Sequence, residues 1–221
     1  MIITVGNTKG GVGKSTVALQ TAVDLALGIT TGEPSRVWLV DGDRQRTSLT
    51  ALTQRGETGR PMLAAAAYED GATLRTQVLQ QAGNFDHIII DAGGRDSSAL
   101  RAALMVSDVV LIPFLPRSFD LWALDDMAGL LEQTRALRDI RALAFLNSAD
   151  PQGGDNADAT AAVAEVQGID LLPARLNRRK AFAHASGAGL HVDEYKPRDG
   201  RACKEMSDLV RATFAAMELS A

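Results

Sequence analysis

The sequence predicts an α/β fold in which an open, mostly parallel sheet carries helices on both faces. Three observations lead to this prediction. Short apolar runs recur along the 221 residues, helix-like segments lie between them, and the runs are almost continuously apolar. Strands covered on both faces have this continuous composition, whereas strands with one face in water alternate between apolar and polar residues. Regular alternation of strands and helices is typical of a parallel sheet.

Six strands are predicted, with helices between most of them. The strands are Ile2–Val5, Arg36–Val40, Phe85–Ile90, Asp108–Ile112, Arg141–Leu146 and Gly168–Leu172. The helical patterns cover residues 15–27, 97–106, 120–138, 157–166 and 202–218. Gly28 is a suitable C-terminal cap for the first helix, and residues 148–156 have the composition of a loop. We predict one domain over residues 1–221, because a chain of this length can bury one sizeable core.

Composition and charge exclude several classes of protein. The apolar fraction of 46% and the charged fraction of 23% are ordinary for a globular protein, and the net charge is −4. The single cysteine excludes an internal disulfide and a cysteine-based metal cluster. No signal peptide is visible, and the longest apolar stretch, residues 102–115, is interrupted by Asp108 and Pro113. We therefore expect a cytoplasmic protein with no membrane partner.

A glycine-rich stretch, Lys9-Gly-Gly-Val-Gly-Lys-Ser-Thr16, lies between the first strand and the first helix. Its glycines allow backbone N–H groups to point at a polyphosphate, and the helix that follows adds free N–H groups and its positive dipole end. We predict a P-loop NTPase, in which Lys14 contacts the β- and γ-phosphates and Ser15 binds Mg²⁺. The nucleotide-binding residues predicted in this loop are Lys9, Gly10, Gly11, Val12, Gly13, Lys14, Ser15 and Thr16.

Carboxylates follow two other predicted strands. Asp41 and Asp43 end the second strand, and Asp91 ends the third. Ligands of parallel sheets bind at the carboxyl ends of the strands, so these side chains are expected near the loop. Asp91 has the position of a Walker B aspartate that holds Mg²⁺, although a strand can end in aspartate for no functional reason. For Asp41 and Asp43 the alternative is a turn that caps the next helix.

The loop has the form KGGxGK[ST], with Thr8 where the ordinary motif has glycine. It resembles the deviant Walker A loop of the ParA/Soj/MinD ATPases. The resemblance implies that Lys9 reaches a nucleotide held by a second copy of the chain, so that Lys9, Lys14 and Asp43 are the catalytic residues. Asp43 would position the attacking water, and Ser15, Asp41 and Asp91 would form the Mg²⁺ site.

The same resemblance extends to later segments and shows departures from the family. Asn147 would contact adenine, with a simple turn residue as the alternative. Pro173, placed at the end of the sixth strand, would pack against the base. Arg44 stands where the family motif DxDPQ has proline. Gly93 and Gly94 stand where the family has a D-x-P-P sequence. These glycines suggest a more mobile switch segment.

A basic segment runs from Arg175 to Lys204 and has a net charge of +5, which leaves −9 for the rest of the chain. This asymmetry indicates an acidic partner. By the resemblance, four residues would bind the backbone of double-stranded DNA without reading its sequence: Arg175, Arg178, Arg179 and Lys180. A solvated surface or an arginine that faces the nucleotide is the alternative interpretation.

The resemblance implies a function close to that of the small, ParF-like plasmid partition ATPases, which lack an N-terminal helix-turn-helix domain. Such a protein would form a homodimer around ATP and Mg²⁺ and bind DNA non-specifically. A centromere-binding, ParB-like partner would stimulate ATP hydrolysis, and the protein would be cytoplasmic and nucleoid-associated. Alternatives are positioning of conjugation machinery or another cargo, a MinD-like regulator, and a P-loop kinase. The last ten residues contain no lysine or arginine, which disfavours a MinD-like membrane helix.

Overall fold

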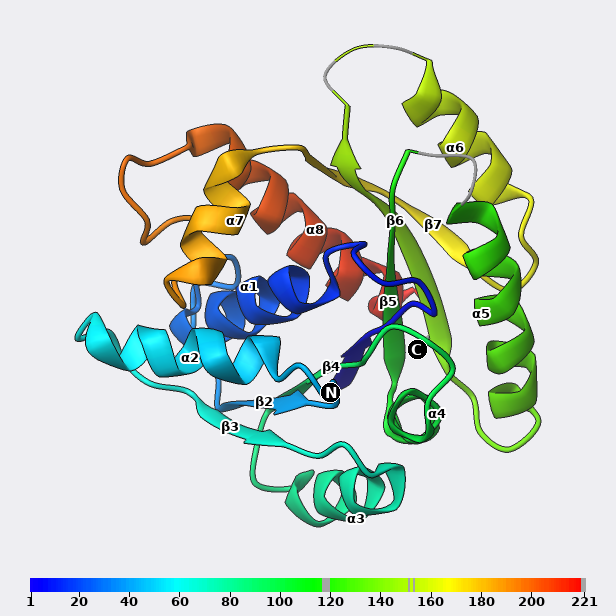
Figure 1. The fold of residues 1–221 in the computed structure, drawn as a ribbon, viewed down its shortest axis with the longest axis horizontal. Helices are drawn as coiled ribbons and strands as arrows, with labels where there is room; N and C mark the ends of the chain where they lie inside the picture. The colour runs from blue at the N-terminus through cyan, green and yellow to red at the C-terminus, as the bar shows by residue number, and fades with distance from the viewer. Residues whose placement is uncertain (117–119, 151, 153, 220–221) are drawn as a thin grey trace.

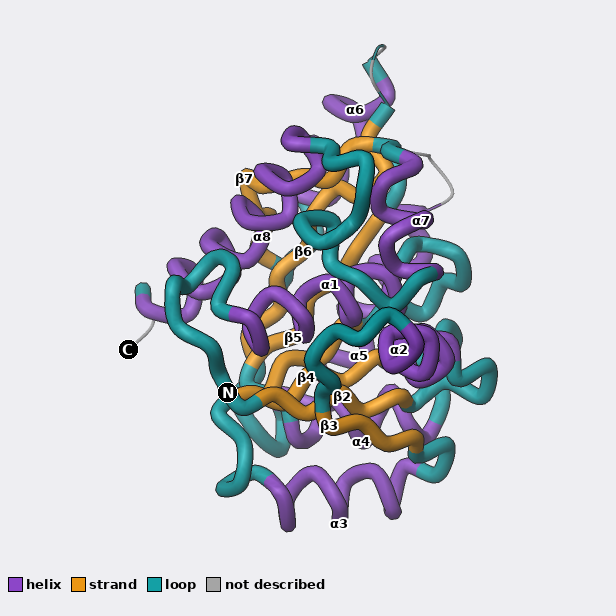
Figure 2. The backbone as a smooth tube through the Cα atoms, turned by 90° about the vertical axis from the view of Figure 1, so that its left-hand side faces the viewer, coloured by secondary structure: helices purple, strands orange, loops and turns teal. Residues whose placement is uncertain are grey.

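The computed structural model describes residues 1–116, 120–150, 152 and 154–219. Seven parallel strands form one sheet in the order β3-β2-β4-β1-β5-β6-β7. Figure 2 shows them as one twisted layer that runs from β3 to β7. The strands are β1 Ile2–Val5, β2 Val37–Asp41, β3 Ala64–Ala67, β4 His87–Asp91, β5 Val109–Phe114, β6 Arg141–Ala149 and β7 Asp170–Asn177.

Helices cover both faces of the sheet, as predicted (Figure 1). On one face α1, α2, α7 and α8 pack over alternate strand residues such as Val5 and Leu39, and on the other face α3 to α6 pack over Val40 and Ile112. Both sets are apolar, which explains the continuous apolar runs. The helices are α1 Lys14–Leu27, α2 Thr47–Glu57, α3 Gly71–Gln81, α4 Ser98–Val106, α5 Asp120–Arg135, α6 Asp155–Ala164, α7 Lys180–Gly187 and α8 Gly200–Glu218. No helix among the described residues is long and apolar enough to cross a bilayer.

The structure confirms the six predicted strands and adds four elements that the pattern does not predict. These are β3, α2, α3 and α7. β3 consists of four alanines, which favour helices over strands, and only its pairing with β2 at the edge of the sheet makes it a strand. The sixth predicted strand continues to Asn177, so the prediction that it ends before Pro173 is wrong. Proline is tolerated there because β7 is an edge strand.

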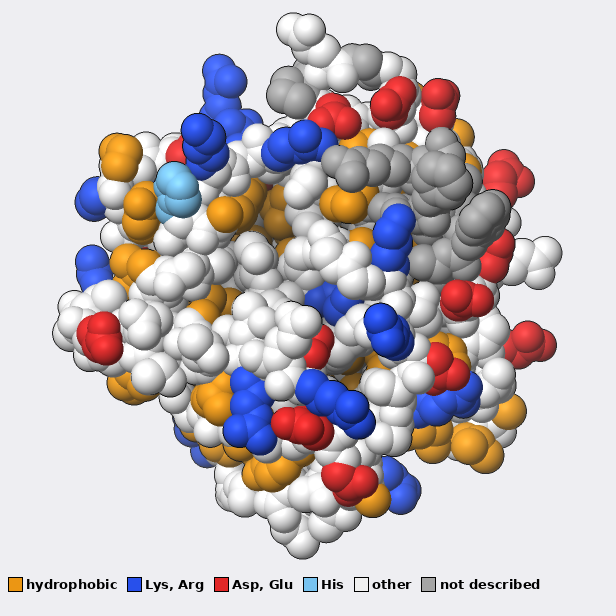
Figure 3. Space-filling view, in the orientation of Figure 1, with side chains coloured by type: hydrophobic (Ala, Val, Ile, Leu, Met, Phe, Trp, Pro, Cys, Tyr) orange, Lys and Arg blue, Asp and Glu red, His pale blue; other side chains and the backbone are white. Residues whose placement is uncertain are grey.

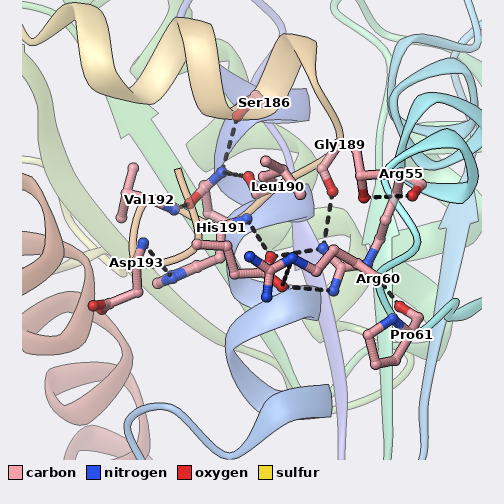
Figure 4. A network of polar contacts seen from close by, with 12 residues as sticks. Arg55, Arg60, Pro61, Ser186, Gly189, Leu190, His191, Val192 and Asp193 are labelled. Atoms are coloured by element: carbon pink, nitrogen blue, oxygen red, sulfur yellow. Dashed lines mark hydrogen bonds and ion pairs between the residues drawn. The ribbon is translucent and has the colours of Figure 1, made fainter. Parts of the chain in front are cut away.

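A buried ion pair fixes the C-terminal half of α2. Arg55 is fully buried, and its guanidinium donates two hydrogen bonds to Glu194, at 2.7 and 3.0 Å. It also donates to the carbonyls of Pro61 and Gly189 (Figure 4). These bonds join α2 to the segment between α7 and α8. These partners compensate the guanidinium for the loss of its hydration, whereas loss of the carboxylate would leave a buried charge without compensation.

We expect Glu194→Gln to lower the free energy of unfolding by about 3–5 kcal/mol, because it leaves the Arg55 charge buried without a counter-charge. Urea unfolding followed by circular dichroism measures this. Asp208→Asn is the matched control, since it removes a carboxylate from the exposed Lys204–Asp208 pair on α8. That control should change stability by less than about 1 kcal/mol. Equal effects of the two substitutions would contradict a structural role for the buried pair.

Candidate nucleotide site

The loop between β1 and α1 is fixed by the side chain of Asn7, and the N-terminus of α1 has no side-chain cap. The Asn7 side chain accepts a hydrogen bond from the Lys9 N–H at 2.9 Å and donates one to the carbonyl of Pro113. Gly11 and Gly13 have φ values of 75° and 90°, which glycine adopts without strain. Gly13 precedes α1 and provides no side-chain cap, so the first N–H groups of the helix are available to an anion.

Lys14 lies folded back onto the loop that would hold the phosphates. Its ammonium donates a hydrogen bond to the Lys9 carbonyl at 2.7 Å, and the side chain is 7% exposed. Burial lowers the pKa of Lys14, while Asp91 and Asp43 raise it by their charge. A phosphate would replace the carbonyl as the partner of this ammonium, so the predicted role of Lys14 fits its position.

Asn147, the predicted adenine ligand, is bonded to the loop itself. Its amide nitrogen donates to the carbonyl of Val12 at 2.7 Å, and a Cβ on Gly13 would lie 2.3 Å from that nitrogen. Gly13 is therefore required twice, by its φ value and by this contact. The side chain of Asn147 thus has a demonstrated structural partner, and its contact with adenine stays a prediction.

A cleft of about 840 Å³ opens beside the loop. Lys14, Ser15 and Thr16 line one side, Asp43 and Arg44 another, and residues 93–99 a third. The structure therefore brings the loop together with Asp43, the residue predicted to position water. Basic side chains lie over the middle of the molecular face seen in Figure 3, and acidic ones gather along the edge near α5 and α6.

Asp91 has the properties expected of a Mg²⁺ ligand. It is the last residue of β4 and fully buried. One carboxylate oxygen accepts a hydrogen bond from the Ser48 hydroxyl, and the other has no hydrogen-bond partner among the described residues. Burial raises the pKa of Asp91 to about 7, while the hydrogen bond from Ser48 and the charge of Lys14 lower it. A buried carboxylate oxygen without a partner, beside a serine hydroxyl, fits a hard cation that prefers oxygen ligands.

Asp41 lies beside Asp91 on the neighbouring strand, but both of its carboxylate oxygens accept hydrogen bonds from backbone N–H groups. The two residues are register partners between β2 and β4. One oxygen of Asp41 accepts the N–H of Asp43 at 3.0 Å, and the other accepts the N–H of Leu49 at 3.1 Å. Burial raises the pKa of Asp41, and these hydrogen bonds lower it. The geometry supports the capping alternative for Asp41, and Asp91 is the better placed of the two for Mg²⁺.

Asp43 lies half-buried at the wall of the cleft. One of its oxygens accepts the N–H of Gln45 at 3.0 Å, which orients the carboxylate. Gly93 lies against the other oxygen, because a Cβ there would be 3.4 Å from it. The carboxylate therefore lies between the loop and the segment after β4. This position is compatible with its predicted role of positioning the attacking water.

The glycine pair after β4 packs directly on the loop, a contact that the sequence pattern does not indicate. A Cβ on Gly94 would lie 2.9 Å from the Lys14 ammonium and 3.0 Å from the Cα of Gly10. A side chain at position 94 would thus collide with the phosphate-binding loop. The one sequence signal for this contact is the glycine pair itself, directly after a strand-terminal aspartate. Ser48 is not predicted either, because its helix, α2, is not predicted from the pattern.

The sequence profile of a family described as "ATPase MipZ" matches residues 1–138 of the chain. The chain belongs to this family of MipZ/ParA-type ATPases. Membership makes the chain an ATPase and sets aside the kinase alternative. It is consistent with the loop, the buried Asp91 and the cleft that joins them.

Known proteins resemble the chain over between half and nearly all of its length. A maintenance of carboxysome distribution protein A from Halothiobacillus neapolitanus is 26% identical over 94% of this chain and 94% of its own length. A Protein ParA from Rhizobium radiobacter is 31% identical over 54% of this chain and 50% of its own. The apo structure of McdA from Cyanothece has a TM-score of 0.78 at 16% identity and covers 96% of this chain and 98% of that one. At this identity the structural likeness shows the fold alone.

The four predicted DNA-binding residues of this ATPase differ in their surroundings. Arg179 donates to Glu205 at 2.7 Å and lies 3.7 Å from Asp199, so its charge is used within the fold. Arg178 pairs with Asp150 but remains about half exposed. Arg175 and Lys180 are exposed, and Arg175 lines a shallow hollow with Arg201 and Lys204 of α8. Pro173 lines this hollow and is not among the residues that line the nucleotide cleft, so its predicted place beside the base is not supported.

Proposed function

We propose that this ATPase positions a large intracellular cargo through an ATP-dependent cycle of dimerisation and DNA binding. The observation that carries the proposal is the loop with Lys9 at its entrance, on a chain that resembles carboxysome distribution proteins over nearly its whole length. The relative named ParA covers only about half of the chain, so plasmid partition has weaker support than positioning of another cargo. We therefore propose a cargo other than a plasmid.

The residues of the site divide the work of the ATPase cycle. Lys14 binds the phosphates, and Ser15 and Asp91 are the residues that would hold Mg²⁺. When bound, this ion neutralises charge on the phosphate oxygens during transfer. Asp43 orients the attacking water. Lys9 completes the site of a second copy of the chain, so hydrolysis and separation of the two copies are linked.

DNA is the proposed surface on which the ATP-bound dimer is retained. The exposed basic residues of β7 and α8 and the start of α7, among them Arg175, Lys180 and Arg201, provide contacts to phosphates. Contacts of this kind give affinity without sequence preference and weaken steeply as salt rises. The test is retention of the protein on immobilised duplex DNA with ATP, ADP or no nucleotide over a salt series. Retention that does not depend on ATP would contradict the proposal.

We expect Arg175→Glu with Lys180→Glu to abolish ATP-dependent retention on DNA at about 150 mM salt. At lower salt, the slope of log affinity against log salt should become shallower by about 0.9 for each phosphate that the variant no longer neutralises. Arg178 and Arg179 are left intact, because Glu at position 179 would face Glu205 and disturb the fold. Arg75→Glu, on an exposed position of α3, is the control for a charge reversal elsewhere on the surface, with half the change in net charge. Unchanged retention in the double variant would show that this surface does not bind DNA.

A further inference from the structure

Arg95 has an unusual backbone conformation at the edge of the nucleotide cleft. It directly follows the Gly93–Gly94 pair, and its φ is 127°. Arg46 and Ser148, the other non-glycine residues with positive φ among the described residues, have φ values of 50°. That value belongs to the ordinary left-handed region, whereas 127° lies outside it. A residue with a Cβ stays in such a conformation only where its surroundings impose it, and such residues concentrate at ligand sites and switches.

The phosphate-binding loop and its lysine lie directly beside this segment. Gly94 lies against the Lys14 ammonium and Gly10, so the backbone of residue 95 is fixed next to the phosphate-binding loop of its own chain. Arg95 is one of the residues that line the nucleotide cleft, together with Lys14 and Asp43. It also lines a neighbouring hollow with Thr8. Arg95 is thus as much a part of the cleft as the predicted site residues are.

The guanidinium of Arg95 has no carboxylate partner among the described residues. Its neighbour Asp96 is held by Arg101 through two hydrogen bonds of 2.6 Å each. A second acidic residue that lines the cleft, Glu69, pairs with Arg46 at 3.2 Å. Other arginines that do have an acidic partner are Arg36, Arg55, Arg60, Arg138, Arg141, Arg178, Arg179, Arg198 and Arg211.

These pairings leave an excess of positive charge inside the cleft. Lys14, Arg44 and Arg95 line it, and Asp43 is the one acidic lining residue without an arginine partner in the described part of the chain. A polyphosphate is the ligand that such an excess would stabilise, and an arginine is suited to it because its fork can donate two parallel hydrogen bonds to phosphate oxygens.

We propose that Arg95 is a catalytic residue that contacts the terminal phosphate of the ATP bound by its own chain. The inference rests on the proposed ATPase function and adds to it a cation supplied by the chain itself. Nucleotide binding moves the Gly93–Gly94 pair off the loop, and Arg95 then turns toward the phosphate that Lys14 also contacts. Hydrolysis removes that phosphate and with it the partner of the guanidinium. An intrinsic arginine makes the basal turnover of this ATPase less dependent on a stimulating partner, since such an arginine can raise kcat by about 10³–10⁵.

The test compares nucleotides that differ only in the terminal phosphate group. Fluorescent ATPγS and ADP, each with Mg²⁺, are titrated into the wild-type protein and the Arg95→Ala, Arg95→Lys and Arg95→Gly variants. All four proteins, including the one that keeps Arg95, carry Lys9→Ala, so that a second copy cannot contribute the contact. We expect Arg95→Ala to weaken ATPγS binding by about 10- to 100-fold, the effect of removing charge-assisted hydrogen bonds to one phosphate. Binding of ADP should change less than about twofold.

The other variants separate the side chain from the backbone. Arg95→Lys should recover part of the ATPγS preference, because lysine retains the charge but not the fork. Arg95→Gly removes the guanidinium and relieves the backbone, and it should weaken ATPγS binding as much as Arg95→Ala does. Arg75→Ala, an exposed arginine on α3, is the control. An unchanged ratio of ATPγS to ADP affinity in Arg95→Ala, or equal weakening of both nucleotides, would overturn the inference. Failure of the proposed function would differ, since the wild-type protein would then bind neither nucleotide.

Discussion

Replacing Asp43 by alanine should leave ATP bound and reduce its hydrolysis by about a hundredfold or more. Asp43 lines the cleft, and the N–H of Gln45 fixes the orientation of its carboxylate. Removal of a group that positions or deprotonates the attacking nucleophile typically costs a factor of about 10²–10⁴. Binding should persist, because Lys14 and the N–H groups of the loop are unchanged. Single-turnover hydrolysis measures the rate, and retention of the variant on DNA with ATP shows whether the ATP state accumulates.

Asp43→Asn separates the charge from the shape of this segment. The asparagine oxygen can still accept the Gln45 N–H, so the loop keeps its conformation while the carboxylate is absent. We expect the asparagine variant to hydrolyse ATP as slowly as the alanine variant. Hydrolysis at the wild-type rate in either variant would remove Asp43 from the mechanism.

Replacing Lys9 by alanine should abolish ATP-dependent dimerisation and change ATP binding by only a few-fold. The backbone of Lys9 is fixed on both sides, by Asn7 at its N–H and by Lys14 at its carbonyl. Removal of its side chain therefore leaves the loop intact. In a two-fold symmetric dimer each interaction occurs twice. At about 1.5–3 kcal/mol for each charged hydrogen bond, removal of both weakens the dimer by more than about a hundredfold.

Light scattering of the size-fractionated protein with Mg²⁺ and ATPγS distinguishes the outcomes for Lys9. The wild-type protein should double its mass, and the Lys9→Ala variant should stay a monomer that still binds nucleotide. Lys14→Ala is the control in which nucleotide binding itself should fail. A Lys9→Ala variant that still forms the nucleotide-dependent dimer would contradict a lysine that crosses between the two copies.

The sequence predicts those parts of this molecule in which local pattern and tertiary surroundings agree. The central strands are apolar on both faces, so their composition alone predicts them. β3 is a run of alanines, and only its pairing with β2 makes it a strand. Pro173 looks like the end of a strand from its sequence, but an edge strand can contain it.

In the candidate site, too, the residues set by local pattern are predicted and those set by tertiary contacts are not. The loop and Asp91 follow from motif and position, because a glycine turn and a strand-terminal carboxylate have few other uses together. The bonds of Asp41 to Leu49, of Asn147 to Val12 and of Arg179 to Glu205 join residues far apart or in unpredicted helices. No local pattern indicates such partners. The close packing of Gly94 on the loop likewise depends on how β4 meets β1 in space.

The two ends of α2 are attached to different parts of the molecule. Near its start, Ser48 holds the carboxylate proposed to bind Mg²⁺, and near its end Arg55 is locked to Glu194. The helix between them spans about 16 Å, the length of 11 residues at about 1.5 Å each. One rigid element therefore joins the candidate nucleotide site to the segment between α7 and α8. The carboxylate of Asp41, which accepts the Leu49 N–H, holds the same end of the helix, so a change in the position of either carboxylate is passed to α2 as a whole.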